Sequence, residues 1–252
     1  MTEFARKIWN RSERDETLDS IFQGKLVVVQ SKRGYRFSLD AVLLARFVEI
    51  SREERIMDLG TGNGVVALIL ASQNPSAQVI GLEIQAQMVD RASRGVTLNR
   101  LKGRVEIVQG DVCSVAQNFA PQSFDIVVSN PPYRRLKSGR VNPNPERTIA
   151  RHEVKASLRD FLSGGAYLLR RGGRMTLVYP AARAIDLFAG MREADLEPRR
   201  LRFVHSFAGA RAAFVLVEGV KGARPELEIM RPLVIYAKRQ QYTDEINAIF
   251  AG

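Results

Sequence analysis

The sequence has few of the residues that bind metals or form disulfides. Its 252 residues include one cysteine, Cys113, and two histidines, His152 and His205. A single cysteine cannot form an internal disulfide, which excludes a disulfide-stapled secreted scaffold. With so few soft ligands we also predict no metal site.

Long apolar runs are lacking as well, and none approaches the ~20 residues needed to cross a bilayer. The first sixteen residues carry charges of both signs and no apolar core of the kind that a secretory signal has. Hydrophobic residues make up 45% and charged residues 26%, which excludes wholesale disorder. We therefore expect a folded cytoplasmic protein.

Acidic residues are outnumbered by basic ones, 27 against 38, so the net charge is +11. The surplus is uneven, because +10 of it lies between Tyr133 and Arg211. A concentrated positive charge of this kind is typical of proteins that bind the phosphate backbone of a nucleic acid. The arginines and lysine that follow Tyr133 are the expected phosphate contacts: Arg134, Arg135, Lys137 and Arg140.

Predicted strands and helices alternate along most of the chain. The predicted strands cover residues 25–30, 55–59, 78–83, 105–108, 124–129, 174–179, 199–205 and 212–218. The predicted helices cover residues 40–49, 65–72, 86–100, 155–171 and 182–194. This alternation predicts an α/β fold, a doubly wound and mostly parallel sheet with helices on both faces. Residues 1–20 are expected to be a polar, loosely docked tail and residues 137–147 a loop.

A glycine-rich turn, Asp58-Leu-Gly-Thr-Gly-Asn-Gly64, joins one predicted strand to a helix. Its three glycines allow a tight turn and close approach of a ligand to the backbone. The next predicted strand, residues 78–83, ends in Glu83, which can accept hydrogen bonds from ribose hydroxyls. Asp111 follows the predicted strand 105–108, where an adenine amino group could be bound. The spacing differs from that of dinucleotide and P-loop turns, which disfavours nucleotide hydrolysis.

A second motif, Ser129-Asn-Pro-Pro-Tyr133, begins at the end of the predicted strand 124–129. The side-chain carbonyl of Asn130 and the backbone carbonyl of Pro131 can accept both hydrogens of one amino group. Pro131 and Pro132 make these acceptors rigid, and Tyr133 offers a flat face for a base. Two acceptors favour a localised nitrogen lone pair, which can then attack a methyl group with no metal or covalent intermediate.

Together the two motifs resemble the class I S-adenosylmethionine-dependent methyltransferases, which have a Rossmann-like sheet of seven strands, one of them antiparallel. The resemblance implies that S-adenosylmethionine is the cofactor and that Asn130, Pro131, Pro132 and Tyr133 are the catalytic set. It implies that Asp58, Gly60, Gly62 and Gly64 face the methionine end, Glu83 the ribose and Asp111 the adenine. The predicted cofactor set also includes Asp40, Thr61, Ile84, Val112 and Asn130.

Two outer segments, Arg36-Phe-Ser-Leu-Asp-Ala-Val-Leu-Leu-Ala45 and Ala150-Arg-His-Glu153, are similar to the bacterial tRNA1(Val) adenine-N6 methyltransferase group. This closer resemblance implies an RNA partner, tRNA, with Asp40 near the cofactor and Arg151 near the catalytic cleft. The resemblance covers roughly Gly34 to Leu216.

We expect the chain to consist of a tail and strand, residues 1–30, and a single methyltransferase domain, residues 31–252.

Other amino-methyltransferases share the Asn-Pro-Pro-Tyr motif, so two alternatives stay open. One is a glutamine-N5 methyltransferase acting on a release factor, which normally has a helical N-terminal domain for which residues 1–30 are too short. The other is an rRNA guanine-N2 methyltransferase. A module that binds the cofactor or RNA without turnover is disfavoured by the presence of both Asn130 and Tyr133.

Overall fold

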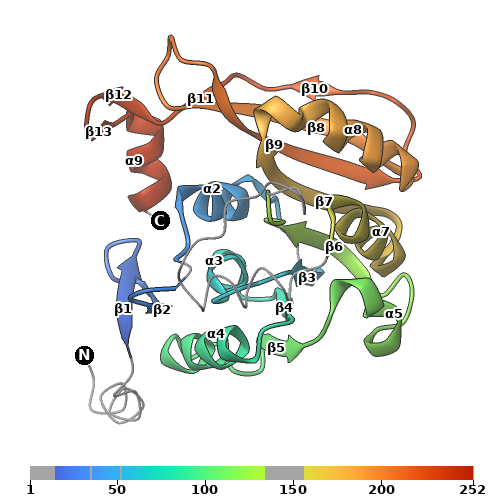
Figure 1. Cartoon of the computed structure of the whole chain (residues 1–252), viewed down its shortest axis with the longest axis horizontal. Coiled ribbons are helices and arrows are strands. Elements are labelled where there is room, and N and C mark those ends of the chain that lie inside the picture. The colour runs from blue at the N-terminus through green and yellow to red at the C-terminus, as the bar shows by residue number, and fades with distance from the viewer. Residues whose placement is uncertain (1–14, 35, 52, 134–155, 252) are drawn as a thin grey trace.

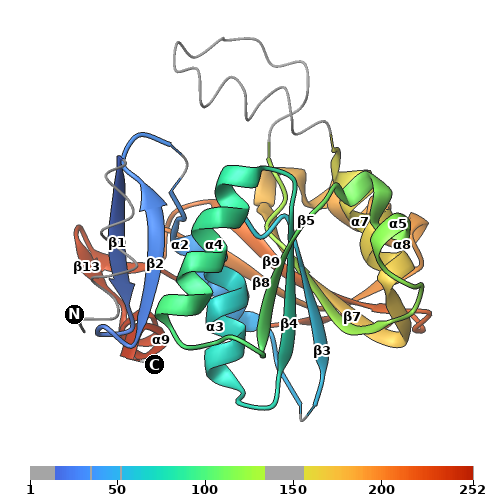
Figure 2. The same ribbon diagram turned by 90° about the horizontal axis from the view of Figure 1, so that it is seen from below.

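The computed structural model describes residues 15–34, 36–51, 53–133 and 156–251. A mixed central sheet has helices on both faces (Figures 1 and 2). Its strand order is β10-β8-β9-β7-β6-β3-β4-β5, and β11 also pairs with β8. The strands are β3 (Arg55–Leu59), β4 (Gln78–Glu83), β5 (Val105–Gln109), β6 (Phe124–Ser129), β7 (Leu169–Pro180), β8 (Leu196–His205), β9 (Ala212–Lys221), β10 (Glu228–Ile229) and β11 (Leu233–Val234).

Strand pairing confirms the predicted mostly parallel sheet. Strands β5, β4, β3, β6 and β7 pair in parallel, and β9 runs antiparallel to both of its neighbours, β7 and β8. The short strands β10 and β11 extend the sheet in parallel beyond the seven strands that the family resemblance implies. The parallel strands β3 to β8 all end at the same side of the sheet, which we call the carboxyl edge.

Two helical layers enclose this sheet. Helices α2, α3 and α4 cover one face, and α5, α7 and α8 cover the other (Figure 2). The helices are α2 (Leu39–Phe47), α3 (Val65–Gln73), α4 (Ala86–Leu98), α5 (Val115–Asn118), α7 (Leu158–Leu168), α8 (Ala184–Glu193) and α9 (Asp244–Ala251), with short 3₁₀ turns η1 (Val112–Ser114) and η2 (Ala181–Arg183).

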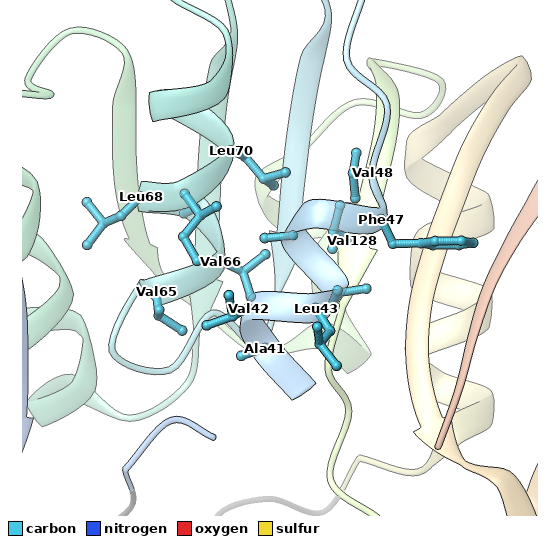
Figure 3. Packing of buried hydrophobic residues seen from close by; sticks show 14 of the residues in the cluster. Ala41, Val42, Leu43, Phe47, Val48, Val65, Val66, Leu68, Leu70 and Val128 are labelled. Atoms are coloured by element: carbon cyan, nitrogen blue, oxygen red, sulfur yellow. The ribbon is translucent and has the colours of Figure 1, made fainter. Parts of the chain in front are cut away.

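Helix α3 is apolar on every side, as expected of a helix that is buried all round. Each residue from Val65 to Ala71 is buried. Figure 3 shows Val65 and Val66 of α3 packed beside Val42 of α2, with Val128 of β6 nearby. This packing fixes the start of α2, and with it Asp40, beside the turn that follows β6.

The N-terminal segment departs from the sequence prediction. Strands β1 (Glu16–Ile21) and β2 (Leu26–Ser31) form a separate two-stranded sheet, so the prediction of a loosely docked tail is wrong for residues 16–20. Glu16 is only 5% exposed and accepts hydrogen bonds from Arg91 at 3.0 Å and Arg94 at 2.8 Å, both on α4. The buried ion pairs fix the hairpin to the body of the protein, an attachment that no local sequence pattern reveals.

The predicted helix over residues 155–171 is too long at its end. A capping box of Ser157 and Asp160 starts α7 at Leu158, and the helix ends at Leu168. Leu169 pairs with Phe124 of β6, so strand pairing overrides the helical tendency of the residues before Gly172. The sequence also missed the elements near the C-terminus, namely α9 and the hairpin of β12 (Tyr236–Lys238) and β13 (Gln241–Tyr242). Within the described ranges, no helix has the length and apolarity to span a membrane.

Candidate active site

The predicted site residues come together at the carboxyl edge. The glycine turn follows β3, Glu83 ends β4, Asp111 follows β5 and Asn130 follows β6. These four strands are neighbours in the order β5-β4-β3-β6. Their ends therefore form one continuous rim, the position at which open α/β sheets bind ligands.

The glycine turn is held by backbone bonds to the adjacent strand. The Gly60 and Thr61 amides both donate to the Leu82 carbonyl, at 2.9 and 3.0 Å. Gly62 has φ +58°, and a Cβ added there would meet no atom within 4 Å. Its backbone is thus open to a ligand. Gly64 caps α3 with φ +81°, where a Cβ would lie 3.0 Å from the Ala92 Cβ.

Two acids lie buried beside this turn. Asp58 is 1% exposed, and burial raises its pKa to about 7 although Thr61 Oγ1, at 2.6 Å, and the Ala67 amide donate to it. Glu83 is 6% exposed, and burial likewise raises its pKa. The Glu83 carboxylate accepts from the amides of Gly62 at 3.0 Å and Gln85 at 2.9 Å, which ties β4 to the turn.

The donor set fits S-adenosylmethionine. Neither Asp58 nor Glu83 has a Lys or Arg ion-pair partner in the described part of the chain, so the local charge favours a ligand that brings positive charge. S-adenosylmethionine carries an ammonium and a sulfonium, together with ribose hydroxyls that a carboxylate can bind. Among the same residues no group of three His, Cys, Asp or Glu could hold a metal ion.

The remaining predicted cofactor residues lie next along the rim. Asp111 caps η1, where its Oδ1 accepts the Cys113 amide at 2.9 Å. Ile84 is half-buried directly after Glu83, and Val112 is 8% exposed. Cys113 is exposed, and partial burial of its thiol together with the Asp111 carboxylate raises its pKa to about 11, so little reactive thiolate forms at neutral pH.

Asp40 links the start of α2 to the Asn130–Tyr133 turn. Its Oδ2 lies 3.3 Å from the Asn130 Nδ2 and 2.6 Å from the Tyr133 hydroxyl. Its Oδ1 accepts the Ala41 amide at 3.0 Å and the Ser38 hydroxyl. Ser38 is the N-cap residue, but its hydroxyl bonds Asp40 rather than the helix backbone.

An amide side chain has one donating and one accepting end, and only the acceptor can bind an amino group. The Asp40 carboxylate holds the Asn130 nitrogen, so the carboxylate selects the orientation in which Oδ1 is the outward acceptor. The Tyr133 hydroxyl lies 2.5 Å from that Oδ1, but its single proton can serve only one oxygen at a time. The charged carboxylate is the stronger acceptor, which leaves the Asn130 oxygen available.

Tyr133 is fixed by three further side chains that sequence reasoning missed. Its ring packs edge to face on Tyr179 of β7, with centroids 5.8 Å apart, and is tilted against Phe214 of β9 at 5.9 Å. Arg183 of η2 donates to the Tyr133 carbonyl at 3.0 Å and lies over the Tyr179 ring at 5.0 Å. No local motif marks these residues, because they approach Tyr133 only through the pairing of β6, β7 and β9.

Several predicted residues fall outside the described ranges. They are the expected phosphate contacts Arg134, Arg135, Lys137 and Arg140, together with Arg151 and His152. Pro131 is buried and Pro132 exposed, while Asn130 and Tyr133 are half-buried at the rim.

The sheet order, the glycine turn after β3 and the acids that end β4 and follow β5 define a class I S-adenosylmethionine-dependent methyltransferase. A solved structure of a predicted O-methyltransferase from Agrobacterium tumefaciens has the same fold, with a TM-score of 0.70 and 23% identity over 84% of this chain and 95% of that one. A geranyl diphosphate methyltransferase solved in complex with S-adenosylmethionine superposes with a TM-score of 0.52 and 13% identity, covering 72% of this chain and 84% of that one.

The sequence comparisons are more specific. A tRNA1(Val) (adenine(37)-N6)-methyltransferase from Bacteroides thetaiotaomicron is 35% identical over 90% of this chain and 94% of its own length. The model of the methyltransferase small domain family matches residues 36–191. The chain belongs to this family, and it is an S-adenosylmethionine-dependent enzyme.

Proposed function

We propose that the enzyme transfers a methyl group from S-adenosylmethionine to the N6 amino group of an adenine in tRNA. The observation that carries the proposal is the Asn130–Tyr133 turn, whose amide acceptor is oriented by Asp40 next to the buried acids. The name of the Bacteroides relative, which states this reaction, supports the choice of tRNA adenine. A tRNA substrate also implies that the enzyme works in the cytoplasm.

The proposed chemistry follows from the acceptors in the turn. The adenine N6 nitrogen is a poor nucleophile because its lone pair is delocalised into the ring. Acceptance of its two hydrogens by Asn130 Oδ1 and the Pro131 carbonyl favours a localised pair on nitrogen. Because the turn is rigid, little reorganisation is needed to reach the transition state.

The other residues have supporting roles in this proposal. Asp58 holds the positively charged methionine end of the cofactor, Glu83 its ribose and Asp111 its adenine. When bound, S-adenosylmethionine would supply a methyl carbon that accepts the lone pair of the amine, and the electrons of the broken carbon–sulfur bond would stay on its sulfur. The surplus proton of the methylated amine leaves to water, so the chain needs no side-chain base.

Mass spectrometry of a strain without this gene tests the proposal. We expect tRNA to lose one N6-methyladenosine, which the wild-type gene restores and Asn130→Ala does not. Loss of a methylated release-factor glutamine, or of N2-methylguanosine from rRNA, with tRNA unchanged, would overturn it.

A further inference from the structure

Most of the positive charge in residues 156–211 is already neutralised. This segment contains ten arginines, and eight of them form ion pairs, many with acids from distant parts of the chain. The pairs are Arg159–Glu193, Arg170–Asp125, Arg174–Glu54, Arg183–Asp186, Arg192–Glu197, Arg199–Glu226, Arg200–Glu49 and Arg202–Glu245. The arginines of this segment therefore do not form a continuous positive surface for phosphates. Cations without an acidic partner are the better candidates for phosphate contacts.

Three cations that have no ion-pair partner in the part of the chain that the structure describes lie beyond the end of β8. Arg211 ends the loop between β8 and β9, and Lys238 and Arg239 lie at the turn of the β12–β13 hairpin. All three are exposed, and among the described residues none of them has a carboxylate partner. Of the acids that begin α9, Glu245 is bound by Arg202, and Asp244 has no ion-pair partner within the ranges that the structure describes.

A row of aromatic rings lies on the same two segments as these cations. Phe207 packs on Tyr236 with centroids 5.6 Å apart, and Tyr236 stacks on Tyr242 at 5.3 Å with an interplanar angle of 15°. Phe207 remains 41% exposed and Tyr242 37%. The loop that carries Phe207 is ordered by His205, whose Nδ1 lies 2.8 Å from the Ala210 carbonyl, so the exposed ring is held in place.

The Phe207 end of this aromatic row lies at the carboxyl edge, the edge that carries the active site, because Phe207 lies just after the end of β8. The carboxyl ends of β6 and β8 are separated by three strand spacings, about 15 Å. Phe214 bridges part of that distance, since it contacts Tyr133 and pairs with Val204 of β8. Figure 1 shows β12, β13 and α9 together beyond the end of β11. About four stacked nucleotides would span the distance from the end of β8 to the Asn130–Tyr133 turn.

We propose that the loop 206–211 and the β12–β13 hairpin form a docking surface for the single-stranded RNA that flanks the target adenine. Phe207 stacks on a base, and Arg211, Lys238 and Arg239 contact phosphates. Exposed aromatics beside available cations are the combination that binds single strands with little sequence preference. The inference rests on the proposed RNA substrate.

Binding of unfractionated tRNA, measured at several salt concentrations, tests this surface. Lys238→Gln/Arg239→Gln is the test variant. Arg100→Gln/Lys102→Gln is the matched control, because these two exposed cations follow α4 and precede β5, at the opposite edge of the sheet. We expect the test variant to lower the slope of log K against log salt by about 1.4, as the loss of two phosphate contacts requires, and the control to leave the slope unchanged.

Phe207→Ala is expected to weaken tRNA binding about tenfold and Phe207→Trp to restore it. Equal Kd values and salt slopes for the test and control variants would overturn the surface, even if the wild-type enzyme methylates tRNA. A wild-type enzyme that binds tRNA through these residues but leaves adenine unmethylated would contradict the proposed function and not the surface.

Discussion

The raised pKa of Asp58 predicts that cofactor binding depends on pH. In the free enzyme this buried carboxyl has a pKa of about 7, so it is largely protonated at pH 6. A positively charged cofactor binds the ionised form better, and binding must then release a proton. Ionised Asp58 rises from about 9% at pH 6 to about 76% at pH 7.5, which predicts about eightfold tighter binding over that range.

Isothermal titration calorimetry in two buffers of different ionisation enthalpy measures both the Kd and the protons released. The range stops at pH 7.5 because the cofactor's own amino group loses its charge above that. We expect nearly one proton released at pH 6 and a flat, weaker Kd in Asp58→Asn. Any slope that survives in that variant belongs to Glu83, whose pKa is also raised. A wild-type Kd that is constant from pH 6 to 7.5, with no proton released, would refute the reasoning.

The raised pKa of Asp58 also predicts how the free energy of unfolding changes with pH. Unfolded Asp58 ionises near its ordinary value of 3.8, whereas the folded protein retains the proton up to about 7. Stability from this group is therefore highest at low pH and falls as the pH rises between these values, by at most about 4 kcal/mol. Asp58→Asn should melt above the wild type at pH 8 and not at pH 4.

Three substitutions test the positioning contacts and the N-terminal hairpin. Asp40→Asn should lower kcat about tenfold to a hundredfold and leave the cofactor Kd within a few-fold, because Asn130 loses its charge-assisted hydrogen bond to Asp40. A rise in Kd alone would instead favour the direct contact between Asp40 and the cofactor that the sequence predicts. Arg183→Gln should lower kcat about fivefold to tenfold with a near-normal melting temperature, and unchanged kinetics would remove Arg183 from the positioning of Tyr133. Glu16→Gln should cost about 3 kcal/mol in urea unfolding at pH 7, because Arg91 and Arg94 both lose the buried Glu16 carboxylate, although Arg94 keeps its ion pair with Asp90. A loss below about 0.5 kcal/mol would contradict a stabilising role of these ion pairs.

The sequence predicts the site better than it predicts the periphery. The four strands that carry or precede Asp58, Glu83, Asp111 and Asn130 are short, and each leads into a motif, so their bounds were predicted to within one residue. The hairpin at Glu16 and the elements after residue 218 depend on contacts between distant segments, which no local periodicity encodes. The same holds for Tyr179, Arg183 and Phe214, which reach Tyr133 only through the sheet.

Charge composition predicts the position of a phosphate-binding surface poorly. The surplus between Tyr133 and Arg211 favours RNA, but eight of the arginines after residue 155 are paired in the fold with acids. Composition counts charges and does not show which of them are neutralised. The two cations of the β12–β13 hairpin, Lys238 and Arg239, lie outside the segment that the sequence marks.

The single-turnover rate of adenine N6 methylation by Asn130→Ala, measured alongside the Kd for S-adenosylmethionine, tests whether Asn130 binds the amine. Loss of one preorganised acceptor predicts a rate about a hundredfold to a thousandfold lower, with the Kd within a few-fold of the wild type. A variant that methylates adenine at the wild-type rate would contradict the assignment of Asn130 as the group that binds the amine.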